Sequence, residues 1–189
     1  TLWLFAEDER IHGFYGIDGL QREAVLLVEG ALPSLADDVE QWASRVEAFS
    51  SQYGESKWSA NQVLGPPDTH KYGDIATAWA PRNIGDDTQF LSLEFGAAVY
   101  ATGVTVRETH CNGFVAQIDV IDQEGALHTV WSGADLALPD IPVDVYIPIE
   151  RTSFLVKGVK IYIDTSRCDG WQEIDAVKLH GVLPDKADE

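Results

Sequence analysis

The sequence of 189 residues contains no methionine, only two cysteines and few basic residues, and each scarcity narrows the classes of protein it can belong to. Lys and Arg number 13 against 31 Asp and Glu, which gives a formal net charge of −18 at pH 7. Such a surface repels phosphate backbones and anionic headgroups. Nucleic acid and membrane surfaces are therefore poor partners, and two cysteines alone cannot complete a zinc site.

Long hydrophobic runs are also missing. No stretch approaches the roughly 20 apolar residues that cross a bilayer, and no basic and then apolar segment opens the chain, so we expect no membrane insertion. The chain begins at Thr1 without methionine, which indicates a segment of a larger, secreted or extracellular polypeptide. The many carboxylates suit divalent cations such as Ca²⁺, although solubility is the simpler explanation of the charge.

Residues 1–48 differ in pattern from the rest. They contain an apolar, β-like run at 24–28 and a helix candidate at 35–42, which Ser34 could cap and whose acidic first turn suits the helix dipole. We therefore predict an N-terminal α/β extension with a short helix over 1–48, a β-sandwich over 49–183 and a flexible tail over 184–189. The partner of the helix could be the sandwich or a neighbouring domain.

From Phe49 onward, short strands alternate with turn residues, which is typical of an antiparallel β-sandwich and makes the fold class all-β. Leu91, Leu93 and Phe95 point to one side and their polar neighbours to the other, as a half-buried strand requires. The turn at 123–125 predicts a hairpin. We predict strands at 90–95, 101–108, 116–122, 127–131, 144–149, 159–164 and 173–180.

Several segments carry a resemblance to a known family. They are Ala48–Tyr53, Trp58–Asp68, Ala78–Pro81, Phe90–Phe95 and Trp171–Val177. In this order and spacing they resemble a discoidin-like, galactose-binding-like jelly-roll domain, of the F5/8 type C or carbohydrate-binding-module kind. The subset is found in large bacterial extracellular proteins and in an F-box and leucine-rich-repeat protein. The resemblance implies a β-sandwich that binds carbohydrate, lipid or protein.

The resemblance also implies a structural calcium ion. In relatives, the loop that corresponds to residues 65–79 often wraps Ca²⁺ together with a glutamate near the last strand. Asp68, Asp74 and Glu173 would be the metal ligands here, because carboxylates and free loop carbonyls are the oxygens that calcium takes. The alternative is that the two aspartates only cap turns.

A ligand site is expected at the rim formed by the loops 109–114 and 166–171. A pyranose needs an aromatic ring for its C–H face and planar polar groups for its hydroxyls. Trp171 or Phe114 could supply the ring, and Arg82, His110 and Asn112 the polar contacts. The alternative for Trp171 is packing in the core.

Cys111 and Cys168 each lie just beyond a predicted strand. If those strands are neighbours, a disulfide would join the two rim loops, and an exported protein would retain it. Two reduced thiols in an intracellular protein are the alternative.

Signs of catalysis are weak. The histidines are dispersed, and the sequence has no metal-binding His pair, nucleophile elbow or phosphate loop. We therefore predict that the protein is not an enzyme but a noncatalytic module for carbohydrate binding or adhesion, to which the resemblance adds a stabilising calcium ion. The alternative is a protein interaction or scaffold domain. A third hypothesis is a hydrolase subunit in which the N-terminal segment contributes the missing groups.

Overall fold

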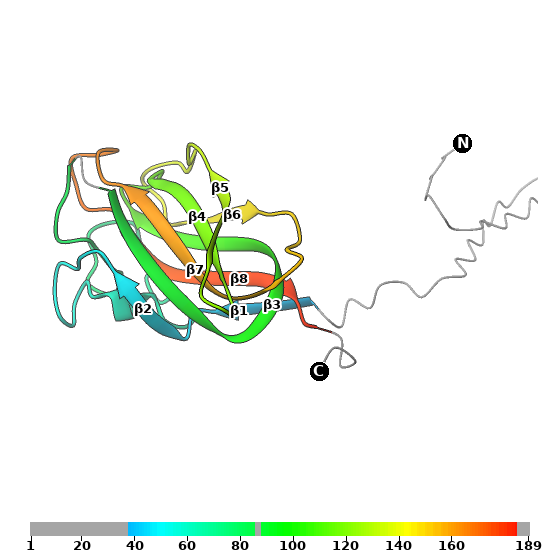
Figure 1. The fold of residues 1–189 in the computed structure, drawn as a ribbon. Helices are drawn as coiled ribbons and strands as arrows, with labels where there is room; N and C mark the ends of the chain where they lie inside the picture. Colours follow the sequence, from blue (N-terminus) through cyan, green and yellow to red (C-terminus); the bar gives the residue numbers. More distant parts are fainter. Residues whose placement is uncertain (1–37, 86–87, 185–189) are drawn as a thin grey trace, which may run out of the picture. The chain divides into compact units, whose positions relative to one another are not determined.

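The computed structural model describes residues 38–85 and 88–184, which form an antiparallel β structure (Figure 1). Its one short 3₁₀ helix in these ranges, η2, spans Ala60–Val63. The strands are β1 (Asp38–Trp42), β2 (Arg45–Phe49), β3 (Thr88–His110), β4 (Val115–Asp122), β5 (Leu127–Ser132), β6 (Val143–Pro148), β7 (Leu155–Asp164) and β8 (Glu173–Val182). No helix within the described ranges is long and apolar enough to cross a membrane.

The long strand β3 belongs to both layers of the sandwich (Figure 1). Its first part lies between β2 and β7, in a layer that continues through β4 to β5. Its last part lies between β6 and β8, and β1 pairs with the far side of β8. The pairing register with β7 shifts between Glu94 and Val99, where the two predicted strands 90–95 and 101–108 join into one.

The predicted all-β jelly roll is confirmed, and the strands from β4 to β8 lie within a few residues of their predicted ranges. The hairpin turn is also present. Gly125 takes a φ of +89° between β4 and β5, a conformation that a residue with a side chain rarely adopts.

The helix predicted at 35–42 is wrong for its described part, because residues 38–42 form strand β1. Val39 and Trp42 have helical spacing, but pairing with β8 decides the conformation: Val39 lies opposite Gly181. Likewise β2 pairs with β3, so residues 38–48 belong to the sandwich and not to a separate extension. Ser34, the run at 24–28 and the tail from 185 lie outside the described residues.

The core lies between the two layers. Leu91 and Ile161 come from one layer and Val104 and Leu179 from the other, and all four side chains are fully buried. Trp79 is buried with them and forms a bridge with Ile174, through reciprocal backbone hydrogen bonds of 2.8 and 3.0 Å. This bridge fastens the loop that precedes β3 to the start of β8, and the candidate site is built around it.

Candidate functional site

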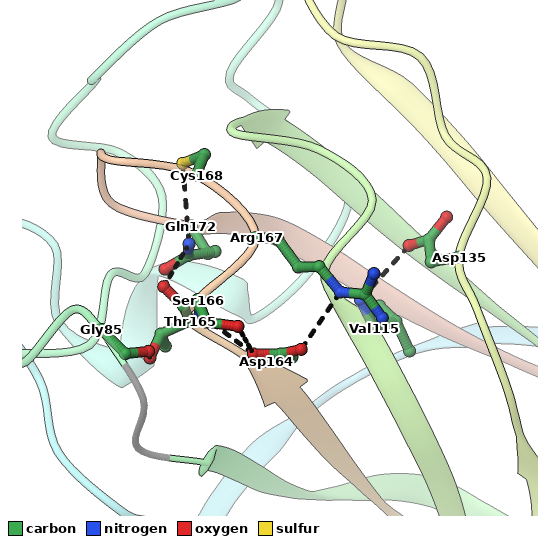
Figure 2. A network of polar contacts seen from close by, with 9 residues as sticks. All are labelled: Gly85, Val115, Asp135, Asp164, Thr165, Ser166, Arg167, Cys168 and Gln172. Atoms are coloured by element: carbon green, nitrogen blue, oxygen red, sulfur yellow. Dashed lines mark hydrogen bonds and ion pairs between the residues drawn. The ribbon is translucent and has the colours of Figure 1, made fainter.

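The loop between β7 and β8, residues 165–172, is held by its own polar groups (Figure 2). Ser166 donates from its backbone N–H and its hydroxyl to Asp164, which also pairs with Arg167 at 3.1 Å. These hydrogen bonds from Ser166 hold the pKa of Asp164 below its ordinary value. At the other end of the loop, the side chain of Gln172 donates to the carbonyl of Thr165. These contacts hold the loop that contains Trp171 in one conformation.

A disulfide between Cys111 and Cys168 joins this loop to the end of β3, with the two Cα atoms 6.0 Å apart. Cys111 has a φ of +54°, so the chain turns sharply where β3 ends. Its backbone N–H donates to the hydroxyl of Tyr72 at 3.1 Å, and the Tyr72 ring packs edge to face against His110. The disulfide thus ties together the two predicted rim loops and the loop that contains Tyr72.

Beside this rim lies a pocket lined mainly by aromatic rings. Its lining residues are Tyr53, Trp58, Asp74, Ala80 and Trp171. Tyr53 is 51% exposed and stands edge to face between the two tryptophans, with ring centroids 5.6 Å from Trp58 and 5.3 Å from Trp171. Aromatic rings around one carboxylate are a surface that binds flat apolar faces and cations.

Hydrogen bonds fix the main chain at the residues that carry these rings. The backbone N–H of Tyr53 donates to the carbonyl of Ala80, and the backbone N–H of Trp58 donates to the carbonyl of Ala76. The backbone carbonyl of Trp171 accepts a 2.9 Å hydrogen bond from Nδ1–H of His110. Segments from three parts of the chain therefore meet at the pocket, and each is anchored by the main chain.

Behind the pocket lies Glu173, the first residue of β8, which is fully buried. One carboxylate oxygen accepts the indole N–H of Trp58 at 3.2 Å, and the other accepts the backbone N–H of Ile75 at 3.1 Å. Burial raises the pKa of Glu173 to about 8, and the adjacent Asp74 acts in the same direction. Glu173 is a buried acid that links the Trp58 ring to the loop of Asp74.

The three predicted metal ligands are divided between two pairs. Asp74 lies beside Glu173, whereas Asp68 lies beside Asp175, which is 2% exposed. Both oxygens of Asp175 accept the backbone N–H of Thr69 at 3.2 Å, and burial raises the pKa of Asp175. Within the described ranges, no three His, Cys, Asp or Glu side chains are grouped as metal ligands.

Of the predicted ligand-binding residues, the structure brings Trp171 to the pocket but not Phe114. The Phe114 ring is fully buried in the core, so its predicted role as an exposed platform is wrong. Asn112 donates to the carbonyls of Leu138 and Ile141 and thereby holds the loop between β5 and β6.

The remaining two predicted residues flank the pocket. His110 holds the backbone of Trp171 and does not line the pocket itself. Arg82 is exposed, and its backbone N–H donates to the hydroxyl of Ser51, two residues before Tyr53.

Tyr53 and Trp58 were not among the predicted binding residues. The available signal was the concentration of aromatic residues in a segment that also carries the family resemblance, because apolar side chains grouped at a surface indicate a binding site. Their meeting with Trp171 depends on long-range contacts that the order of residues does not display.

A second buried acid lies under the rim. Glu108 is fully buried, and one of its oxygens accepts the backbone N–H of Gly113 at 2.8 Å. Burial raises the pKa of Glu108 to about 10, and a hydrogen bond with Asp135 adds to the effect. Asp135 in turn accepts the backbone N–H groups of Val115 and Ala137 (Figure 2 shows the contact to Val115). Glu108 thus lies between the end of β3 and Asp135 of the loop between β5 and β6.

Comparison with solved structures identifies the same fold in several proteins. Reduced XRCC1 bound to the DNA polymerase β catalytic domain aligns at 16% identity over 76% of this chain and 99% of that one, with a TM-score of 0.60. Chitosan-binding module 1 of the chitosanase/glucanase from Paenibacillus sp. IK-5 aligns at 16% identity over 77% and 96% of the two chains, with a TM-score of 0.52. The family 32 carbohydrate-binding module of NanJ from C. perfringens, in complex with galactose, aligns at 15% identity over 75% and 99%, with a TM-score of 0.53. At these identities the likeness establishes the fold.

Comparison of the sequence with protein families gives a more direct result. Residues 34–187 match the family model described as Pappalysin-1, SD scarf domain, C-terminal. A search among curated proteins finds no significant match. The matched range includes every described strand, both cysteines and the whole aromatic pocket.

Proposed function

Since the chain belongs to the family of the C-terminal SD scarf domain of pappalysin-1, we propose that it acts as a noncatalytic module that binds carbohydrate at its aromatic pocket. The observation that carries this proposal is the arrangement of Tyr53, Trp58 and Trp171 around the side chain of Asp74. The family match covers the whole sandwich, and the pocket supplies the proposed site.

The chemistry of the pocket suits a sugar. The apolar C–H face of a pyranose stacks on an exposed aromatic ring, and Tyr53 is the most exposed ring of the three that line the pocket. The carboxylate of Asp74 is an acceptor for sugar hydroxyls, and the Tyr53 hydroxyl can donate or accept. Because the Trp58 ring is already held by its hydrogen bond to Glu173, little freedom of this side chain is lost on binding.

Two of the similar structures are consistent with this proposal. One is a chitosan-binding module and another is a carbohydrate-binding module in complex with galactose, and both share the β-sandwich described here. A fold is compatible with many functions, so the pocket carries more weight than the likeness.

The proposal is tested with a glycan array followed by calorimetric titration of the best ligands. Tyr53→Ala and Trp171→Ala are expected to weaken binding by about tenfold or more, since loss of a stacking ring costs roughly 1–2 kcal/mol. Tyr146→Ala is the matched control, because Tyr146 is similarly exposed (53%) but lies on β6. The absence of binding to any glycan at millimolar concentration would refute the proposal.

A protein interaction or scaffold role is the second candidate. One observation favours it: the loop between β5 and β6 exposes Leu136, Leu138 and Ile141, by 85%, 69% and 55%. Exposed apolar side chains grouped on one loop are typical of an interaction site. The substitution of Leu136 and Leu138 by serine would abolish partner binding under this alternative and leave glycan binding unchanged.

We also propose a structural Ca²⁺ ion, for which Asp68 and Asp175 would be the carboxylate ligands instead of the predicted set of Asp68, Asp74 and Glu173. Carboxylate oxygens are suitable ligands for Ca²⁺, and Asp68 and Asp175 lie beside each other although they come from distant segments. Neither side chain forms an ion pair with a basic residue in the described part of the chain, so their charge is available to the ion. Backbone carbonyls and water would complete the coordination. We also propose that the protein is secreted and acts in adhesion. The disulfide supports secretion, because disulfides persist in exported proteins.

A further inference from the structure

We propose that the aromatic pocket recognises the ammonium group of an amino sugar, so that the preferred glycan carries a free amine and not a neutral or acetylated substituent. This inference rests on the proposed carbohydrate-binding function and names the class of sugar. It is drawn from the composition and charge of the pocket lining, which contains aromatic residues and an acid but no basic side chain.

The aromatic rings provide the first part of the recognition. A cation within about 6 Å of an aromatic ring centroid is attracted by the negative face of the ring, and tryptophan attracts it most strongly. Tyr53 stands nearly perpendicular to both tryptophans, at 77° to Trp58 and 75° to Trp171. Rings in perpendicular planes line the pocket with faces of different orientation, as in sites that bind ammonium groups.

Asp74 provides the second part. Its side chain is exposed in the pocket, and it forms no ion pair with Lys, Arg or His anywhere in the described part of the chain. Glu173 lies directly behind it. An ammonium group would therefore meet an acid that no protein cation neutralises, and it would donate to this acid in a charge-assisted hydrogen bond.

An amino sugar satisfies the pocket better than the other ligands of similar size. A neutral sugar leaves the carboxylate with hydroxyl donors only, and N-acetylation replaces the ammonium by a neutral amide. A lysine ammonium lacks the ring that would stack on Tyr53, which is 51% exposed and lines the pocket. The amine and the pyranose ring together use both parts of the lining.

The test compares oligosaccharides of one linkage and length by calorimetry, with a chelator present so that no divalent cation competes for Asp74. The ligands are the β-1,4-linked tetramers of glucosamine, N-acetylglucosamine and glucose, at a pH below neutrality where the amine is protonated. We expect the glucosamine tetramer to bind about tenfold more tightly than the other two, the range of a cation-aromatic contact plus an ion pair.

The Asp74→Asn variant is expected to lose this preference, so that the three tetramers bind to it with similar affinity. Asp169→Asn is the matched control. Asp169 is an exposed residue of the loop between β7 and β8, two residues before Trp171, and it lies outside the pocket. If Asp169→Asn lost the preference equally, a general attraction between a polycation and an acidic protein would explain it, and the inference would be wrong.

Other results separate this inference from the proposed function. Equal binding of all three tetramers would overturn amine recognition and leave carbohydrate binding intact. A lack of binding by every tetramer and every glycan on the array would overturn both. Tighter binding of a trimethyl-lysine peptide than of the glucosamine tetramer would assign the pocket to a modified polypeptide. Tyr53→Ala, with Tyr146→Ala as its control, tests the aromatic part if Asp74→Asn is poorly folded.

Discussion

The indole N–H of Trp58 donates to the carboxylate of Glu173 across 3.2 Å, although 115 residues separate the two in sequence. The same carboxylate accepts the backbone N–H of Ile75, so the first residue of β8 holds both the aromatic loop and the loop that carries Asp74. The shape of the pocket therefore depends on a buried acid that no ligand has to touch.

Replacement of Glu173 by alanine is expected to lower the free energy of unfolding by about 2–3 kcal/mol. The change leaves two partly buried N–H donors without an acceptor, and an unpaired buried donor costs about 1–3 kcal/mol before any relaxation. Urea denaturation measures the effect, and the exposed Asp169→Ala is the control, for which a change within about 0.5 kcal/mol is expected. A loss as small as that of the control would mean that water satisfies Trp58 and Ile75.

The stability of the protein should fall as the pH rises, and Glu108 should account for part of the slope. Its folded pKa of about 10 lies above its ordinary value of 4.5, so the folded state retains a proton that the unfolded state has lost. Between these values one such group lowers the free energy of unfolding by at most about 1.4 kcal/mol per pH unit. Glu173, with a pKa of about 8, acts with the same sign up to that pH.

Glu108→Gln isolates the first contribution. The amide can accept the hydrogen bond from Gly113 and donate to Asp135, but it has no proton to lose. Denaturation curves from pH 5 to 9 should give a shallower decline for this variant than for the wild type, with the difference largest at high pH. Parallel declines would show that Glu108 is ionised in the folded protein.

The strands were predictable where local pattern and burial agree. The alternation of Leu91, Leu93 and Phe95 is visible in the sequence, and these side chains are buried in the structure. Strand β1 was not predictable, because Val39 and Trp42 have the spacing of a helix face and the residues that make them a strand are in β8. A period seen in five residues does not identify a partner more than a hundred residues away.

The candidate site shows the same division. Trp171 was found because the rim loops were expected at the end of the sandwich, whereas Phe114 was placed at the surface and is in the core. Both residues follow a turn, and the sequence does not say which way each ring points. The pairs Asp74 with Glu173 and Asp68 with Asp175 depend on the bridge between Trp79 and Ile174, which only the folded chain reveals.

Removal of the disulfide should lower stability and weaken ligand binding together. Cys111 and Cys168 are 57 residues apart, and a crosslink of this span contributes up to about 4 kcal/mol by restricting the unfolded chain. The Cys111→Ser, Cys168→Ser double variant is compared with the wild type by denaturation and by titration with the best glycan. Because the disulfide anchors the loop of Trp171, we expect weaker binding as well. Unchanged affinity would show that the hydrogen bonds of Asp164 and Gln172 position that loop without the crosslink.

Calcium should raise the melting temperature if Asp68 and Asp175 hold the ion. A ligand bound only by the folded state at one hundred times its dissociation constant adds about 2.7 kcal/mol, which for a domain of this size is a rise of roughly 5–10 °C. Melting is measured after chelation and again after calcium is restored. Asp175→Asn should abolish the response, while Asp169→Asn, which removes one exposed charge elsewhere, should retain it. A wild-type melting temperature that is the same with chelator and with calcium would reject the ion. The buried carboxyl groups of Asp175 and Glu173 would then be stabilised only by protonation and by hydrogen bonds, from Thr69 to Asp175 and from Ile75 and Trp58 to Glu173.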